Sequence, residues 1–109
     1  MTASNSDGSQ TAVISTEHTL GTITTAGTYQ LQVDMNALAN GDTVVLRTKL
    51  KVRSSGTTRL MYEDSYSHVQ SQLVAVTIPA AATNEVVFTL EQTAGTGRAF
   101  PWEIVQLDG

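Results

Sequence analysis

The clearest hydrophobic pattern in the chain is a strict alternation through Thr43–Arg53, which reads TVVLRTKLKVR. Apolar residues and one threonine hold every second position: Val44, Leu46, Thr48, Leu50 and Val52. Basic residues hold positions between them: Arg47, Lys49, Lys51 and Arg53. Because successive side chains of a strand point to opposite faces, this pattern predicts one long strand with an apolar face and a cationic face.

The same period of two predicts further strands over residues 28–35, 57–68, 72–78, 85–92 and 99–107, with one or two short strands within 11–25. Short connectors rich in Gly, Asn and Ser separate them, and no segment has a convincing helical period. Pro101 cannot donate to a ladder, so the last strand is expected at a sheet edge or after a bulge. We therefore predict an all-β fold: an antiparallel two-sheet β-sandwich of about eight strands, either jelly-roll or immunoglobulin-like.

The length of 109 residues fits one domain, which we place at residues 11–109. Residues 1–10 (MTASNSDGSQ) are polar, and we interpret them as a flexible N-terminal arm that could order on a partner. The chain has no cysteine, which excludes disulfides and thiolate metal sites. Its start does not have the pattern of a secretory signal, and no apolar run approaches the ~20 residues of a membrane span, so we expect assembly in cytosol without a membrane partner.

Charge changes this picture, because the chain has six basic and ten acidic residues and a formal net charge of −4. Five of the basic residues fall within thirteen positions and are our candidate partner-binding residues: Arg47, Lys49, Lys51, Arg53 and Arg59. Glu63 on the return strand is expected to lie near Arg47 or Lys49 and to neutralise little of this patch. An acidic chain is a poor nucleic-acid binder, so we expect the patch to meet an acidic protein or a neighbouring copy.

Candidate catalytic and metal-binding residues are few. His18 and His68 belong to no recognisable motif, and Glu63 and Asp64 are neighbours on a strand and face opposite ways. The connector between two predicted strands is residues 36–42 (NALANGD). Four residues in or beside it have side-chain oxygens, the ligands that calcium prefers, but turn formation explains each of them: Asp34, Asn36, Asn40 and Asp42. We predict no enzyme activity, no metal and no other cofactor.

Apolar and aromatic residues suggest two kinds of binding surface. Leu60, Met61, Val74 and Val76 exceed what one small core needs, so we expect an oligomer. Most aromatic residues share the apolar side of their strands, but Tyr66 and Trp102 lie near strand ends beside polar neighbours. Exposed aromatic residues of this kind would favour binding of a carbohydrate.

Three stretches resemble a known family: T-x-x-G-T-Y in the strand before the connector, N-G-D before the basic strand, and Q-T-A-G-T-G-R-x-F-P-W near the end. Over most of residues 11–107 the chain resembles small virion proteins of tailed bacteriophages, of the head decoration (cement) type. The resemblance implies a β-sandwich that binds the major capsid protein on the outside of the shell, often as a homotrimer. It also implies a virion location after assembly in the host cytoplasm, and it brings no catalytic residues. A carbohydrate- or receptor-binding module of a phage tail or baseplate is the alternative.

Overall fold

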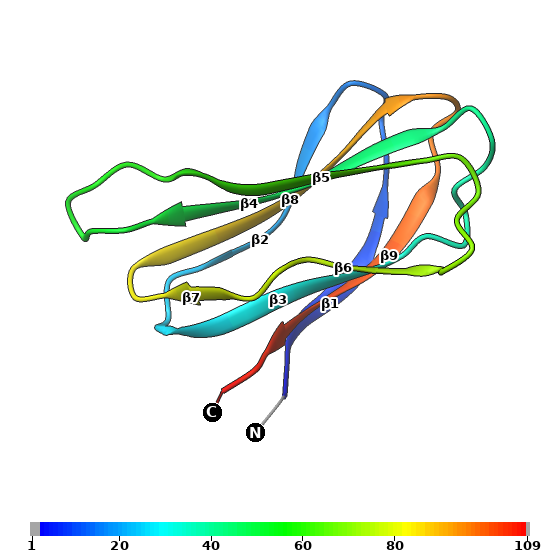
Figure 1. Cartoon of the computed structure of the whole chain (residues 1–109). Helices are drawn as coiled ribbons and strands as arrows, with labels where there is room; N and C mark the ends of the chain where they lie inside the picture. The colour runs from blue at the N-terminus through cyan, green and yellow to red at the C-terminus, as the bar shows by residue number, and fades with distance from the viewer. Residues whose placement is uncertain (1–2, 109) are drawn as a thin grey trace.

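The computed structural model describes residues 3–108 of the chain (Figure 1). It is all-β, and residues 3–108 contain no helix. The strands are β1 Ala3–Thr11, β2 Glu17–Ile23, β3 Gly27–Asp34, β4 Thr43–Lys51, β5 Arg59–Ser67, β6 Val74–Val76, β7 Ala80–Ala82, β8 Glu85–Ala94 and β9 Ala99–Gln106. No helix in this part of the chain has the length and apolar character needed to span a bilayer.

The strands form two packed antiparallel sheets, which confirms the predicted β-sandwich. Sheet A has the order β1-β9-β3-β6, with β7 also paired to β3, and sheet B has the order β2-β8-β4-β5. Strands therefore pair from the two ends of the chain inward: β1 with β9, β2 with β8, β3 with β6 and β7, and β4 with β5. This nesting is the order of a jelly roll, a long hairpin rolled into two sheets, and it differs from the immunoglobulin arrangement.

The core lies between the two sheets and is built from the apolar parity of the predicted strands. Tyr29, Leu31 and Val33 of β3 are completely buried, and they face Val44 and Leu46 of β4 across the sandwich. Strand β8 supplies three more completely buried side chains, and β9 supplies two: Val86, Phe88, Leu90, Phe100 and Ile104. Burial of such side chains is worth roughly 1.5–3 kcal/mol each, so this layer carries most of the stability of the fold.

The interpretation of the N-terminus as a flexible arm is wrong for the described residues, because Ala3–Thr11 forms β1. This strand pairs with β9 from Ala3↔Gln106 to Thr11↔Ala99, and its backbone groups rather than apolar side chains hold it there. Gly8 lies opposite Trp102, and a Cβ at Gly8 would come within 3.2 Å of the indole ring. The glycine thus leaves room for the indole against β1. Residues 1 and 2 of the predicted arm lie outside the described residues.

The expected edge position of the last strand is also wrong, since β9 lies between β1 and β3. Pairing of β9 with β3 begins only at Val33↔Trp102, whereas Pro101 pairs with Ser9 of β1. Proline is tolerated because β9 has only one neighbouring strand at that position.

The return strand β5 departs from its predicted alternation through a bulge. The register passes from Thr48↔Tyr62 to Lys49↔Leu60, which leaves Met61 as the extra residue. A bulge shifts the following residues to the opposite face of a strand. Leu60 therefore lies on the outer face, 54% exposed, and not on the core side with Tyr62.

Candidate functional site

The cationic face of β4 lies on the outside of sheet B, where acidic side chains from three other strands surround it. Arg47 Nε is 2.6 Å from Glu63 Oε2 of β5, and Arg47 Nη1 is 2.8 Å from Glu91 Oε1 of β8. Lys49 Nζ is 3.0 Å from Glu17 Oε2 of β2, which is also 3.5 Å from Arg47 Nη1. Two cations and three carboxylates thus form one network across the four strands of the sheet.

The electrostatics of this network favour its charged form. Hydrogen bonds to Glu91 and then Glu63 raise the pKa of Arg47. The pKa of Glu17 is lowered, first by a hydrogen bond from the Thr89 hydroxyl and then by Lys49, which together outweigh its partial burial. Glu63 lies beside Arg47, as expected. The expectation that this half of the patch stays mostly unneutralised is wrong, because Glu91 and Glu17 also reach Arg47 and Lys49.

The other three candidate partner-binding residues, Lys51, Arg53 and Arg59, gather where the β4–β5 hairpin projects. Pairing of β4 with β8 ends at Lys51↔Glu85, so residues 52–58 extend beyond the rest of sheet B (Figure 1). Among the ion pairs formed by residues 3–108, none involves these three cations. The acidic Glu85 at the base of the hairpin accepts a hydrogen bond from Thr58. The hairpin tip therefore remains positively charged and is available to a partner.

One long side of the sandwich, here called the open side, carries exposed apolar side chains. It is formed by β5, which ends sheet B, and by the segment through β6, which ends sheet A. Seven apolar side chains of these strands and the segment beside them are at least 37% exposed: Leu60, Met61, Val69, Leu73, Val74, Val76 and Ile78. Leu60 lies on the outer face of sheet B, whereas Val74 and Val76 lie on the outer face of sheet A, on either side of the buried Ala75. Sheet ends also offer unpaired backbone groups to another chain. The open side therefore has two features that favour contact with a protein.

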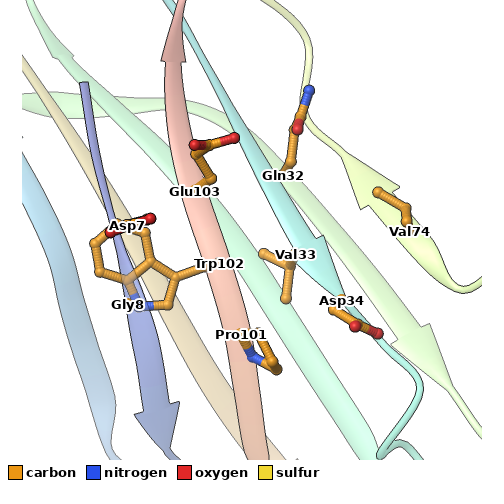
Figure 2. Close-up of a pocket in the computed structure, with 9 residues that line it drawn as sticks. All are labelled: Asp7, Gly8, Gln32, Val33, Asp34, Val74, Pro101, Trp102 and Glu103. Carbon is orange, nitrogen blue, oxygen red and sulfur yellow. The ribbon is translucent and has the colours of Figure 1, made fainter. Parts of the chain in front are cut away.

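A hollow of about 400 Å³ lies on sheet A (Figure 2). No pattern in the sequence identified this hollow as a site. Its polar residues come from neighbouring positions of three strands, because Asp7 pairs with Glu103 and Glu103 pairs with Gln32. Asp34 lies two positions further along β3, and Val74 of β6 pairs with it. Gly8, Val33, Pro101 and Trp102 complete the lining. These three carboxylates are the only charged residues in the five strands of sheet A, a signal that becomes visible only once strand order is known.

The four residues considered for a metal do not converge on one point. Asp34 accepts a hydrogen bond from the Asn36 N–H, and Asn40 accepts one from the Val69 N–H. Within residues 3–108 no group of three or more His, Asp or Glu side chains is placed to hold a metal ion. Asp42 instead turns inward and joins three segments, as described next.

Asp42 is 1% exposed and acts as a structural centre at one end of the sandwich. Its Oδ2 accepts hydrogen bonds from the Ala39 N–H at 2.9 Å and from Arg98 Nε at 2.8 Å, and its Oδ1 accepts one from the Thr96 N–H at 3.1 Å. Burial alone would raise the pKa of Asp42, but these bonds outweigh burial and lower it. The connector, the β8–β9 turn and β4 are thereby held together.

Both histidines bind backbone groups. His18 Nε2 accepts a hydrogen bond from the Val13 N–H, and His68 Nδ1 accepts one from the Gly41 N–H, each at 3.0 Å. Of the two aromatic residues singled out from the sequence, Tyr66 lies half-buried on β5 beside Asp64, and Trp102 lies half-buried on β9 at the hollow. Both are only partly accessible to a ligand.

In comparisons with known protein families, curated proteins and solved structures, nothing matches this chain.

Proposed function

We propose that this protein is a bacteriophage capsid decoration (cement) protein. It binds the major capsid protein on the outer surface of the shell and stabilises the coat lattice without catalysing a reaction. The observation that carries the proposal is the open side, where seven exposed apolar side chains lie along two sheet ends. The resemblance of residues 11–107 to small virion proteins is the reason for proposing a phage capsid as the assembly that this side contacts. Association as a homotrimer and a virion location, with no nucleic-acid or membrane partner, belong to the same proposal.

The chemistry of the open side suits a protein surface. Exposed apolar patches of this kind mark contact sites, and a strand at a sheet end can accept an extended segment of another chain. Jelly rolls occur among viral capsid proteins and among lectins, so the fold is compatible with this function without selecting it.

The proposal is tested by adding the purified protein to coat shells assembled without it. We expect saturable co-sedimentation with the shells and a higher temperature of shell breakage, measured by light scattering. A charge placed on the open side by Val76→Asp should weaken binding at least tenfold. Val13→Asp is the matched control, since Val13 is 59% exposed against 43% for Val76 and lies in the β1–β2 turn. Shells that neither bind the protein nor gain heat resistance would contradict the proposal.

The hollow on sheet A favours a second candidate, a carbohydrate- or receptor-binding module of a phage tail or baseplate. It is lined by three carboxylates and Gln32, polar groups of the kind that hold sugars, and by Trp102, whose side chain packs against the core. Trp102 is the only tryptophan of the chain, so its fluorescence reports directly on this site. Quenching or a spectral shift by a hit from a glycan array, lost in Asp34→Asn, would support this function. An array without hits would remove it.

A further inference from the structure

The tip of the β4–β5 hairpin and the hollow on sheet A carry opposite charges, and each has an exposed apolar side chain. We propose that the hairpin tip of one copy docks into the hollow of a second copy. The inference deepens the homo-oligomer part of the proposed function by naming the contacting surfaces, and it is tested without any capsid shell.

The hairpin tip is built to enter a partner. Residues 52–58 lie beyond the last pair between β4 and β8, and at the base of the tip Asn84 Nδ2 donates a hydrogen bond to the Val52 carbonyl at 2.9 Å. Val52 at its base is 75% exposed, the highest exposure among the large apolar residues of the described chain. Three cations lie at or beside the tip: Lys51, Arg53 and Arg59. Glu85 at the base of the hairpin is the one acidic residue near them in the described chain, so the tip keeps a net positive charge.

The hollow has the opposite character. Asp7 and Asp34 are exposed and Glu103 is half-buried, and no strand of sheet A contains a basic residue that would neutralise them. Its apolar lining by Pro101 and by Val74, which is 59% exposed, offers a surface for an apolar side chain such as Val52. Three cations and one valine would therefore meet three carboxylates and an apolar wall.

The positions of the two surfaces exclude contact within one molecule. Strand β3 ends at Asp34, the connector then crosses to sheet B, and β4 runs back along the sandwich to Lys51. Figure 1 shows the β4–β5 hairpin and the end of β3 that leads into the connector at opposite ends of the sandwich. The hollow, lined by residues of sheet A near that end of β3, and the hairpin tip on sheet B are therefore far apart. A contact between different surfaces of identical copies is head-to-tail, and it closes into a ring when the rotation between copies permits.

The opposite charges fix how the two copies are positioned relative to each other more than they strengthen the contact. Exposed ion pairs contribute roughly 0.2–1 kcal/mol each, so three pairs leave the contact dependent on apolar burial and sensitive to salt. We expect association at micromolar to millimolar concentration that weakens at least fivefold when NaCl rises from about 50 mM to about 500 mM, as screening of exposed pairs requires.

A charge swap tests the proposal by sedimentation velocity. The first variant carries Arg53→Glu and Arg59→Glu at the hairpin, and the second carries Asp34→Lys and Glu103→Lys at the hollow. Each variant alone should be monomeric where the wild-type protein associates, because its hairpin and hollow then have the same sign. An equimolar mixture should associate again, since both combinations of hairpin and hollow are then of opposite sign. Unchanged circular dichroism and melting temperature would show that the variants are folded.

Because the chain has no cysteine, the contact can also be trapped. Copies with Ser55→Cys at the hairpin tip, mixed under oxidising conditions with copies bearing Ser9→Cys beside Pro101, should form a disulfide-linked heterodimer. Ser65→Cys on β5 is the control for Ser9→Cys and should crosslink at least fivefold less. The proposal is overturned if the wild-type protein stays monomeric up to millimolar concentration. It is also overturned if the charge variants associate as the wild type does, which would point to the open side instead, or if mixing restores nothing.

Discussion

Replacing Asp42 by alanine is expected to lower the free energy of unfolding by about 4 kcal/mol, through loss of three hydrogen bonds to a buried carboxylate. The substitution removes the acceptor of the Ala39 and Thr96 N–H groups, and hydrogen bonds of this kind to a charged group are worth roughly 1.5–3 kcal/mol each. Arg98 adds little, because its side chain is 34% exposed and water replaces its partner.

Asp42→Asn gives a graded test of the same reasoning. The asparagine side chain keeps one oxygen and turns an amide donor toward N–H groups, so we expect a loss of about 2 kcal/mol, between wild type and alanine. Asp34→Asn is the matched control, since Asp34 is exposed and asparagine can still accept the hydrogen bond from the Asn36 N–H. That variant should change stability by less than about 0.5 kcal/mol.

Urea unfolding followed by Trp102 fluorescence, at one protein concentration, measures these differences as shifts of the midpoint at constant slope. Domains of this kind are stable by only about 5–15 kcal/mol, so the alanine variant should unfold at a much lower urea concentration. Equal midpoints for Asp42→Asn and Asp34→Asn would refute the structural role assigned to Asp42.

The pH dependence supplies an independent check. The pKa of Asp42 is lower in the folded protein than its usual value, so the unfolded chain binds a proton more readily. The stability contributed by Asp42 is therefore complete above the unfolded pKa of about 3.9 and is lost as the pH falls through the folded pKa. The gap between wild type and Asp42→Asn should be constant from pH 7 to about pH 5 and narrow at lower pH. A gap that persists at pH 2 would contradict this assignment.

Four further predictions concern single sites. Gly95→Ala should destabilise by more than about 3 kcal/mol, because φ is +89° and a Cβ would overlap the buried carboxylate of the connector. Gly41→Ala, where φ is +96° but no atom lies within 4 Å of the added Cβ, should cost only about 1 kcal/mol in urea unfolding. Burial, then the Asp64 carboxylate, raises the pKa of Tyr66 to about 12, so Asp64→Asn should lower its midpoint in an alkaline absorbance titration while Tyr66→Phe removes that step. Thr48→Val should raise the melting temperature, with a gain of about 1 kcal/mol, because its buried hydroxyl has no hydrogen-bond partner among the described residues; a lower melting temperature would contradict this.

Local alternation accounts for the parts of the fold that the sequence predicted well. In β4 the parity of Val44, Leu46 and Thr48 places all three in the core, as the pattern requires. The bulge at Met61 was not predicted, because an extra residue on one strand depends on its pairing with the partner strand. The polar strand β1 was missed for a related reason. Its residues have no apolar period, and only pairing with β9 makes them a strand.

The candidate site depended still more on non-local order. The sequence marks Arg47 and Lys49 as a cationic face, but Glu17 and Glu91 reach them only because β2, β8 and β4 are successive strands of sheet B. The hollow likewise arises from residues nearly a hundred positions apart, with Asp7 opposite Glu103. An alternation of charges along one strand predicts a charged face, whereas the order of strands in the sheet determines which opposite charges lie beside that face.

The nested pairing of strands has a consequence for how the chain folds. Partners lie 9 positions apart at Leu50↔Arg59, and 103 positions apart at Ala3↔Gln106. Closing the longest loop directly costs about 2 kcal/mol more than closing the shortest, whereas closure from the hairpin outward adds only short loops at each step. We therefore expect strand pairing to begin at the β4–β5 hairpin and to spread outward, in milliseconds to seconds, so that the two chain ends pair last. Pulsed hydrogen exchange would show this as early protection of β4 amides and late protection of β1, and the opposite order would exclude it. A mutation that destabilises the β4–β5 hairpin would therefore delay every later step of folding, whereas a mutation that loosens the pairing of β1 with β9 would leave the inner strands paired.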